Sequence, residues 1–356
     1  MRLGFLLISA IAIFCVSQFS ASASTEVKTD SNAANQQQKL TVLFDAFGRE
    51  DALVKDWGYA ALIEVAGKRI LFDTGNDPAV LEHNVKAKGV DLSKLDLVVI
   101  SHRHGDHIGG LSYVLSINPN VKIFAPKETF GVFGSSLPSS FYRKDTALAP
   151  EQRYFNGSPP DVMKFGTAWP KANITLIDTT TEIAPGITLL PLVSDKPGTL
   201  ELRELSLAID TPQGLVVVVG CSHPGIDRIL QAATGIDKRI HMVVGGMHLA
   251  LAPDDEIMKL ASMIHDQYHV EWIAPGHCTG EPAFAALERS FGAHYLYAGV
   301  GSVIDLSFPR RADSGSLKHQ AMNLDDLRAY RAIARNLLIG FGMRQPEAGK
   351  PSNPEP

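Results

Sequence analysis

The chain has little cysteine, little net charge and, after its first residues, no long hydrophobic run. Its 356 residues include three cysteines and carry a net charge of -5. Three cysteines are too few for the disulfide framework of a small secreted domain. No basic stretch resembles the electrostatic footprint of a nucleic-acid-binding protein. The sequence therefore disfavours a disulfide scaffold, and it disfavours DNA or RNA as a substrate.

The first residues have the order of a secretory signal. Met1 and Arg2 precede an apolar run from Leu3 to Val16, and Ala21-Ser22-Ala23 supplies small residues for cleavage. This run is shorter than the about 20 apolar residues of a membrane-spanning helix. We therefore predict a signal peptide over residues 1–23, a polar linker over 24–39, and a periplasmic or secreted protein without stable membrane insertion.

The rest of the chain has the composition of one globular domain with 45% hydrophobic residues. Short β-prone runs joined by turn residues predict two hairpins, and a longer segment of helical composition predicts a helix. These elements are Ala60–Val65 with Arg69–Phe72, Leu205–Ile209 with Leu215–Val219, and a helix over Pro78–Gly89. We expect an α/β domain over 40–310, followed over 311–356 by a helix from Asn323 to about Ile339 and a disordered tail.

Four predicted strands end in turns that carry both glycine and histidine. The turns follow the runs Leu95–Ile100, Leu215–Val219, His241–Val244 and Glu271–Ala274, and they carry His102 with His104, His223, His248 and His277, respectively. Open α/β sheets place their sites at the carboxyl ends of strands. The repetition therefore predicts one site assembled from distant segments.

The densest of these turns holds three histidines and an aspartate within six residues. His102 and His104 share a face and can hold one cation, while Asp106 and His107 turn toward a second position. Nitrogen and carboxylate ligands suit one or two Zn²⁺ ions, with Fe and Mn as alternatives. The cluster alone does not complete two coordination shells. The best candidates for the missing ligands are His223 and His277.

Four further residues have two interpretations each. His248 is a candidate catalytic donor to a substrate oxyanion or a core residue, and Asp73 hydrogen-bonds a ligand histidine or stabilises its turn. Cys221 is a soft ligand or a small buried side chain. Cys221 and Cys278 can form a single disulfide after export, but their neighbours His223 and His277 favour a metal site.

Residues 126–171 form a long irregular segment rich in proline, glycine, serine and aromatic residues. The aromatic residues are Phe130, Phe133, Phe141, Tyr142, Tyr154, Phe155 and Trp169. Long insertions of this kind are often lids or binding loops. A tolerated surface insertion is an equal alternative. If the segment is a lid, it selects the substrate.

The string from Ser101 to Gly110, SHRHGDHIGG, resembles the signature of the metallo-β-lactamase superfamily, with Phe72-Asp73-Thr74-Gly75 upstream. Three more segments, GCSHPGI from Gly220, GGMHL from Gly245 and GHCTG from Gly276, resemble its 7,8-dihydropterin-6-methyl-4-(β-D-ribofuranosyl)-aminobenzene-5'-phosphate synthase-like branch. The resemblance covers Leu40 to Asp305. It implies a four-layer αβ/βα sandwich in a single catalytic domain, with a mononuclear or dinuclear metal site.

By this similarity, His102, His104 and His223 would hold one metal, and Asp106, His107 and His277 would hold the other. One departure concerns the aspartate that bridges the metals in many superfamily hydrolases after a glycine at the end of the corresponding strand. Here Cys221 follows Gly220. The resemblance therefore leaves the relative affinity of the two metal positions open.

The branch name implies an intracellular condensation, and a signal peptide argues against that role. We expect an exported metal-dependent hydrolase of a small-molecule ester, phosphodiester, lactone or amide, in an oligomeric state that the sequence leaves open. A metal-bound hydroxide would attack the substrate, with Asp106 as ligand and proton acceptor and His248 as donor.

Three other functions compete with the metal-dependent hydrolase, and a fourth is excluded. A dihydropterin synthase-like transferase and a non-catalytic metal-dependent binding protein are the alternatives, and a nucleophile at Cys221 or Cys278 is a weaker one. Aspartic-protease chemistry is excluded because Asp73-Thr74-Gly75 has no second copy in the chain.

Overall fold

The computed structural model describes residues 38–128, 136–138, 144–164, 169 and 171–307. The predicted signal peptide, nearly all of the linker and the predicted carboxyl-terminal helix and tail lie outside these residues. The expected start of the domain near Leu40 agrees with the first strand, β1, which begins at Lys39. Among the described residues, no helix combines the length and the apolar character that a membrane crossing requires.

The first sheet has seven strands in the order β15-β1-β2-β3-β4-β5-β8. Their bounds are β1 Lys39–Phe44, β2 Ala60–Val65, β3 Lys68–Phe72, β4 Leu97–Val99, β5 Lys122–Pro126, β8 Asn173–Ile177 and β15 Val303–Asp305. Strands β2 and β3 pair antiparallel across Ala66 and Gly67, whose φ angles are 49° and 71°. Positive φ at both central residues gives the turn twist that fits a two-residue hairpin. The first predicted hairpin is confirmed.

The second sheet has six strands in the order β14-β13-β12-β11-β10-β9. Their bounds are β9 Thr181–Ala184, β10 Ile187–Val193, β11 Arg203–Thr211, β12 Gly214–Val219, β13 Ile240–Gly246 and β14 Trp272–Gly276. Strands β11 and β12 form the second predicted hairpin, while β12, β13 and β14 run parallel. Three of the histidine-bearing turns thus leave the same edge of this sheet.

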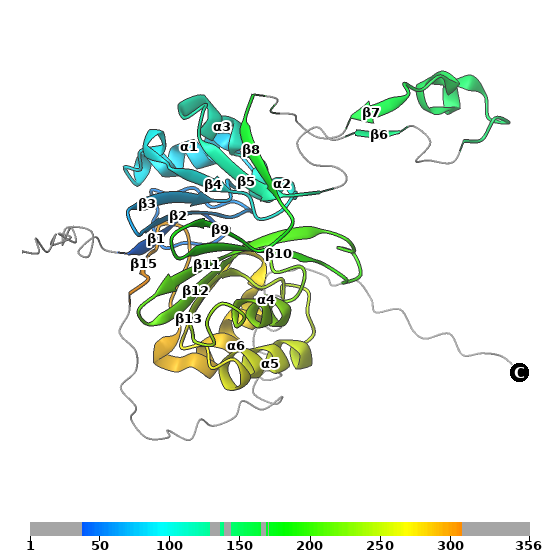
Figure 1. Ribbon diagram of the computed structural model, residues 1–356. Coiled ribbons are helices and arrows are strands. Elements are labelled where there is room, and N and C mark those ends of the chain that lie inside the picture. The colour runs from blue at the N-terminus through cyan, green and yellow to red at the C-terminus, as the bar shows by residue number, and fades with distance from the viewer. Residues whose placement is uncertain (1–37, 129–135, 139–143, 165–168, 170, 308–356) are drawn as a thin grey trace, which may run out of the picture. The chain divides into compact units, whose positions relative to one another are not determined.

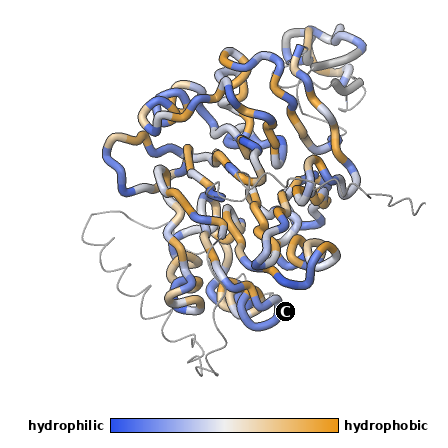
Figure 2. The backbone as a smooth tube through the Cα atoms, turned by 60° about the vertical axis from the view of Figure 1, so that its left-hand side comes forward, coloured by the Kyte–Doolittle hydropathy of each residue, from blue (hydrophilic) through white to orange (hydrophobic). Residues whose placement is uncertain are grey.

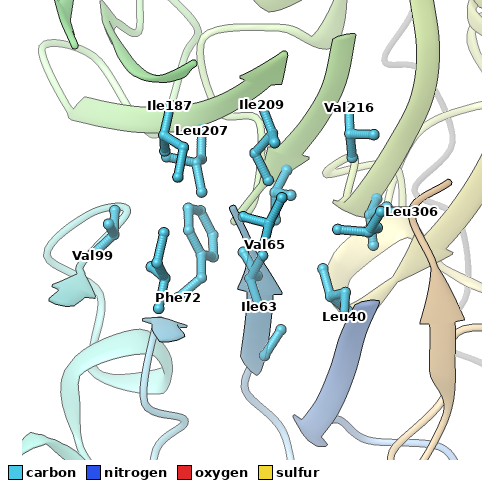
Figure 3. Close-up of a cluster of buried hydrophobic side chains, with 14 of the residues drawn as sticks. Leu40, Ile63, Val65, Phe72, Val99, Ile187, Leu207, Ile209, Val216 and Leu306 are labelled. Atoms are coloured by element: carbon cyan, nitrogen blue, oxygen red, sulfur yellow. The ribbon is translucent and has the colours of Figure 1, made fainter. Parts of the chain in front are cut away.

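Three hydrophobic layers hold the sheets and helices together. The inner faces of the two sheets meet in one core, in which Phe72 and Val99 face Ile187 and Leu207 (Figure 3). Helices α1 (Pro78–Ala87) and α3 (Leu111–Ile117) cover the outer face of the first sheet. Helices α4 (Ile226–Ala233), α5 (Asp254–Ser262) and α6 (Glu281–Phe291) cover the second (Figure 1). The predicted four-layer αβ/βα sandwich is confirmed.

The periodicity of the sequence explains these layers. Strand β12 is buried at every position, and the residues of helix α4 that are buried, Ile226, Ile229, Leu230 and Ala233, have helical spacing. In the hydropathy-coloured view, orange stretches run through the interior of the fold and blue stretches are frequent at its periphery (Figure 2). Strands buried on both faces therefore carry continuous apolar runs, and the covering helices carry one apolar stripe.

The segment that enters the histidine cluster is shorter and more sharply bent than predicted. A 3₁₀ turn over Leu92–Lys94 delays β4 until Leu97, and a short helix, α2 (Gly105–Ile108), holds part of the histidine cluster. The diglycine separates α2 from α3. A Cβ atom on Gly110 would lie 2.1 Å from the carbonyl oxygen of Thr74. Glycine at this position is thus required for the start of α3 to pack against the turn that follows β3.

The long segment over 126–171 is partly described. Strands β6 (Ser136–Pro138) and β7 (Val162–Lys164) pair antiparallel within it, and Phe155 is 54% exposed with φ of 55°. Phe130, Phe133, Phe141 and Tyr142, which the sequence analysis singled out, lie outside the described residues. The lid role of this segment stays a prediction.

Candidate metal centre

Six predicted metal ligands meet at the carboxyl ends of strands from both sheets. His102 and His104 follow β4, and Asp106 and His107 lie in α2. His223 follows β12, and His277 follows β14. The structure gathers these six side chains into two groups of three. The groups are those that the resemblance implied.

The first group is formed by His102, His104 and His223. Their ligand atoms lie within 4.8 Å of one another, and His102 Nε2 is 3.1 Å from His104 Nδ1. Tetrahedral Zn²⁺ with Zn–N distances of 2.0–2.1 Å separates two ligand nitrogens by about 3.3–3.4 Å. The observed spacing is therefore close to one edge of such a coordination shell. His102 and His223 are buried, and His104 is half-buried.

The second group is formed by Asp106, His107 and His277. His277 Nε2 lies 3.2 Å from His107 Nε2 and 3.3 Å from Asp106 Oδ2, and His107 Nε2 lies 3.7 Å from the same carboxylate oxygen. Two nitrogens and one carboxylate oxygen suit a divalent cation of the zinc or iron class. The donor atoms present in both groups therefore fit a pair of divalent cations.

The Cys221 thiol lies between these two groups. Its Sγ atom is 3.2 Å from His107 Nε2, and it shares a cluster of potential ligands with His102 and His107. Cys221 and Cys278 are buried free thiols, so the alternative of a disulfide is wrong for this structure. Their strands, β12 and β14, are separated by β13, and two strand spacings of about 4.8 Å exceed the usual Cα separation in a disulfide. Cys221 thus occupies the boundary between the proposed cations.

Asp73 orients two of the histidines. Its Oδ2 atom accepts hydrogen bonds from His107 Nδ1 and from Ser101 Oγ, both at 2.7 Å, and Ser101 Oγ lies 2.8 Å from His102 Nδ1. Because Ser101 donates to Asp73, His102 Nδ1 donates to Ser101. Both histidines then present an Nε2 lone pair to the centre. The predicted hydrogen bond between Asp73 and a candidate ligand histidine is present, at His107.

Glu204, on β11, orients His223 and was missed by the sequence analysis. This buried carboxylate accepts from His223 Nδ1 at 3.0 Å, and its two oxygens also accept from the backbone N–H groups of Cys221, Ser222 and His223. These bonds outweigh burial and lower the pKa of Glu204. The only sequence signal is an acidic residue at the border of an apolar strand, which does not by itself indicate a partner.

Asp45, at the end of β1, was also missed. It is fully buried, and its Oδ2 atom accepts from the backbone N–H of His277 at 2.9 Å. Burial raises the pKa of Asp45 well above its usual range. The residue anchors the turn that carries His277.

His102 and His104 of the first group and His107 of the second have opposite pKa shifts. Burial lowers the pKa of His102 well below its usual range, and burial together with nearby His223 lowers the pKa of His104 to about 4. Burial alone would also lower the pKa of His107, but the adjacent Asp73 carboxylate raises it to about 9. Without metal, His102 and His104 are therefore neutral and can bind a cation at neutral pH, whereas His107 must first release a proton.

His248, the candidate donor, lies beside the first group. Its ring centroid is 4.3 Å from that of His223, and its φ is 52°, which is unusual for a residue with a side chain of this size. His248 and His223 also line a cavity of about 420 Å³ together with Lys196, Met247 and Lys259. His248 is thus exposed to a space in which a small molecule fits, and the core interpretation of this residue is wrong.

Comparison with known proteins agrees with this geometry. The family description for the metallo-β-lactamase superfamily matches residues 58–192. A 7,8-dihydropterin-6-methyl-4-(β-D-ribofuranosyl)-aminobenzene-5'-phosphate synthase from Methanocaldococcus jannaschii is 29% identical over 293 residues, which are 74% of this chain and 95% of that protein.

Two solved structures are also similar. Tm1679, a metal-dependent hydrolase of the β-lactamase superfamily, matches with a TM-score of 0.57 and 27% identity over 76% of this chain and 99% of its own. The metallo-β-lactamase fold protein YhfI from Bacillus subtilis shares the fold at a TM-score of 0.50 and 15% identity, over 76% of this chain and 99% of its own. Residues 58–192 of the chain thus form a metallo-β-lactamase domain.

Proposed function

We propose that this chain is an exported hydrolase that uses a pair of Zn²⁺ ions held by the six predicted ligands. The observation that carries the proposal is the convergence of His102, His104 and His223 beside Asp106, His107 and His277 at the carboxyl ends of strands from two sheets. Asp73 and Glu204 accept hydrogen bonds from the Nδ1 atoms of His107 and His223, respectively. Proteins orient metal-binding histidines in this way.

When bound, such a cation pair supplies a water activated at neutral pH and polarises the bond under attack. The protein contributes position and proton transfer. Asp106 is the one carboxylate in the two triads, and we assign it the role of proton acceptor as well as ligand. His248 lies next to the first triad with its ring exposed to the cavity, and we assign it the role of donor to the developing oxyanion.

The surroundings of the centre favour a small-molecule substrate. The cavity next to His223 and His248 has a volume of about 420 Å³, within the usual range of small-ligand sites. Lys196 and Lys259 line it, and Trp57, which is 49% exposed, lies with its ring centroid 5.1 Å from that of His277. We propose that the substrate carries a part that fills this cavity and an ester, phosphodiester, lactone or amide group at the centre.

The test combines metal analysis with a hydrolysis panel. Wild-type protein and the His104→Ala variant are analysed for bound zinc and assayed on phosphodiesters, esters, lactones and β-lactams. The matched control is His83→Ala, which changes an exposed histidine that contacts Ala52 outside the centre. We expect His104→Ala to lose cation binding and to reduce hydrolysis at least about 100-fold, while the control changes neither. Full hydrolysis after complete chelation of the metal would contradict the proposal.

A synthase-like transferase is the second candidate, because the Methanocaldococcus jannaschii synthase aligns over 95% of its own length. Incubation with a dihydropterin and a ribofuranosyl-aminobenzene phosphate distinguishes the two candidates. A condensation product without hydrolysis of any panel substrate would favour the transferase. Bound metal without turnover of either kind would favour a binding protein.

Export is a separate part of the proposal and rests on the amino-terminal sequence. The mass of the protein recovered from the exported fraction of producing cells tests it. A mature chain that begins near Ser24 is expected. A chain that retains residues 1–23 inside the cell would contradict export, while the proposed hydrolysis would remain testable.

A further inference from the structure

A third group of potential ligands lies beside the two triads. Cys221, His248 and Cys278 place one ligand atom each within 4.8 Å of the other two. Both thiols are buried, with 3% and 4% exposure, and neither is in a disulfide. The three residues follow β12, β13 and β14, which are parallel neighbours in the second sheet. The three side chains therefore come together because parallel neighbouring strands end at the same edge of the sheet.

Gly246, the last residue of β13, makes room for this meeting. A Cβ atom on Gly246 would lie 2.8 Å from Cys278 Sγ and 3.4 Å from the Cα atom of Cys221. The same Cβ would lie 2.4 Å from the Gly220 carbonyl oxygen, so any larger residue would force the backbone apart. Cys278 Sγ lies 3.6 Å from the Cys221 carbonyl oxygen. The glycine lets thiols from the two outer strands approach each other across the middle one.

The donor atoms of this group differ in chemistry from those of the triads. The triads offer three nitrogens, or two nitrogens and an oxygen, whereas Cys221, His248 and Cys278 offer two sulfurs and one nitrogen. With metal–sulfur distances of about 2.3 Å, sulfurs of a tetrahedral site lie about 3.8 Å apart. A cation of this size fits the observed cluster with small side-chain movements. Thiolate ligands select soft cations.

We propose that Cys221, His248 and Cys278 form a distinct site for one thiophilic cation, such as Cd²⁺ or Cu⁺. Binding replaces the two thiol protons with the cation, and these protons are released to solvent. Cys221 belongs to this site and also lies between the two triads, because its Sγ atom is 3.2 Å from His107 Nε2. Occupation of the site therefore competes for this sulfur with the pair of cations. The inference goes beyond the proposed hydrolysis and does not require turnover.

The experiment is a titration of the full metal-free chain with Cd²⁺ under reducing conditions, with Cys15→Ser present in every sample so that only Cys221 and Cys278 supply thiols. Bound cations are counted, and the ultraviolet thiolate-to-cadmium charge-transfer absorbance reports the cysteines alone. We expect wild-type protein to bind one cation more than Cys278→Ser and to show about twice its charge-transfer absorbance. His104→Ala is the matched control, because it removes a triad ligand and should leave the absorbance unchanged. The melting temperature of each variant, with and without Cd²⁺, identifies a variant that fails to fold.

Each outcome bears on one proposal. Equal absorbance and equal stoichiometry in wild-type protein and Cys278→Ser would overturn the thiophilic site. Cys278→Ala provides a second version of the same test if the serine variant does not fold. Cation binding that depends on His104 without any charge-transfer band would leave the triads intact and reject only the third site. A charge-transfer band without binding that depends on His104 would reject the pair of cations and keep the third site.

Discussion

Glu204 is expected to control metal binding without touching the metal. In Glu204→Gln, one side-chain oxygen remains an acceptor and the other position becomes an NH₂ group. In wild-type protein, Oε1 accepts from the backbone N–H groups of Cys221 and Ser222, and Oε2 accepts from the backbone N–H and Nδ1 of His223. In either orientation of the amide, its NH₂ group replaces one of the two oxygens. Two of the four N–H groups then face the NH₂ group and lose their acceptor.

The magnitude follows from these contacts. Hydrogen bonds to a charged group contribute about 1.5–3 kcal/mol each, so the loss of two bonds costs about 3 kcal/mol or more of folding free energy. A domain with about 5–15 kcal/mol of stability remains folded after a loss of about 3 kcal/mol. The ring of His223 also loses its fixed orientation. Loss of such an outer partner typically lowers metal affinity 10–100-fold, or by about 1.4–2.7 kcal/mol.

The assay measures zinc affinity by competition with a chelator, and stability by denaturant unfolding of the metal-free protein. The matched control is Glu271→Gln, because Glu271 also accepts from an imidazole, His241 Nδ1 at 3.1 Å, at the opposite ends of β13 and β14. We expect the control to destabilise the chain without changing zinc affinity. If Glu204→Gln binds zinc as tightly as wild-type protein, or if the control lowers zinc affinity equally, the reasoning about His223 is refuted.

The remaining predictions concern pH and backbone packing. In the metal-free protein the raised pKa of His107 stabilises the fold below pH 6.5, and this contribution is lost as the pH rises through about 9. Asp73→Asn is expected to remove this contribution, at a cost of about 3 kcal/mol of folding free energy. Unfolding measurements and an NMR titration of the imidazole would show the loss. Zinc must displace the proton of His107, so zinc affinity at the second triad should rise about tenfold per pH unit up to about pH 9. The low pKa of His104 makes zinc affinity at the first triad nearly independent of pH near neutrality. Equal pH slopes for the two triads in calorimetry would contradict this difference. Gly110→Ala places a Cβ atom against the Thr74 carbonyl oxygen and should lose about 2–3 kcal/mol of stability in thermal unfolding. Gly105→Ala is the control and should lose little, because a Cβ atom there meets open space. Similar losses in the two variants would argue against close packing at Gly110.

Local patterns were sufficient to predict much of the fold. The β2–β3 hairpin follows from two apolar runs joined by a turn with Gly67, and β12 follows from a continuous run of valines. The predicted strand into the histidine cluster was too long, because the 3₁₀ turn over Leu92–Lys94 depends on the side chain of Asp91, which accepts from Ser93 N at 3.0 Å. A local polar contact of this kind competes with strand propensity and is difficult to predict from apolar pattern alone.

The sequence by itself identified the candidate donors of the proposed metal centre. His102, His104, Asp106 and His107 lie within six residues after a buried strand, so their proximity is guaranteed by chain connectivity. Glycine-bearing turns after other strands indicated His223 and His277, because parallel strands deliver their carboxyl ends to one edge of a sheet. The proposed metal chemistry thus depends on a few short sequence segments.

Only the tertiary structure decided how those donors are held and what lies between them. His107 and His277 meet although 170 residues separate them, and Glu204 reaches His223 from a neighbouring strand. The contact between the Cys221 and Cys278 segments depends on the missing side chain of Gly246. Such contacts depend on strand order and register, which the burial of two sheet faces and three hydrophobic layers selects for the chain as a whole.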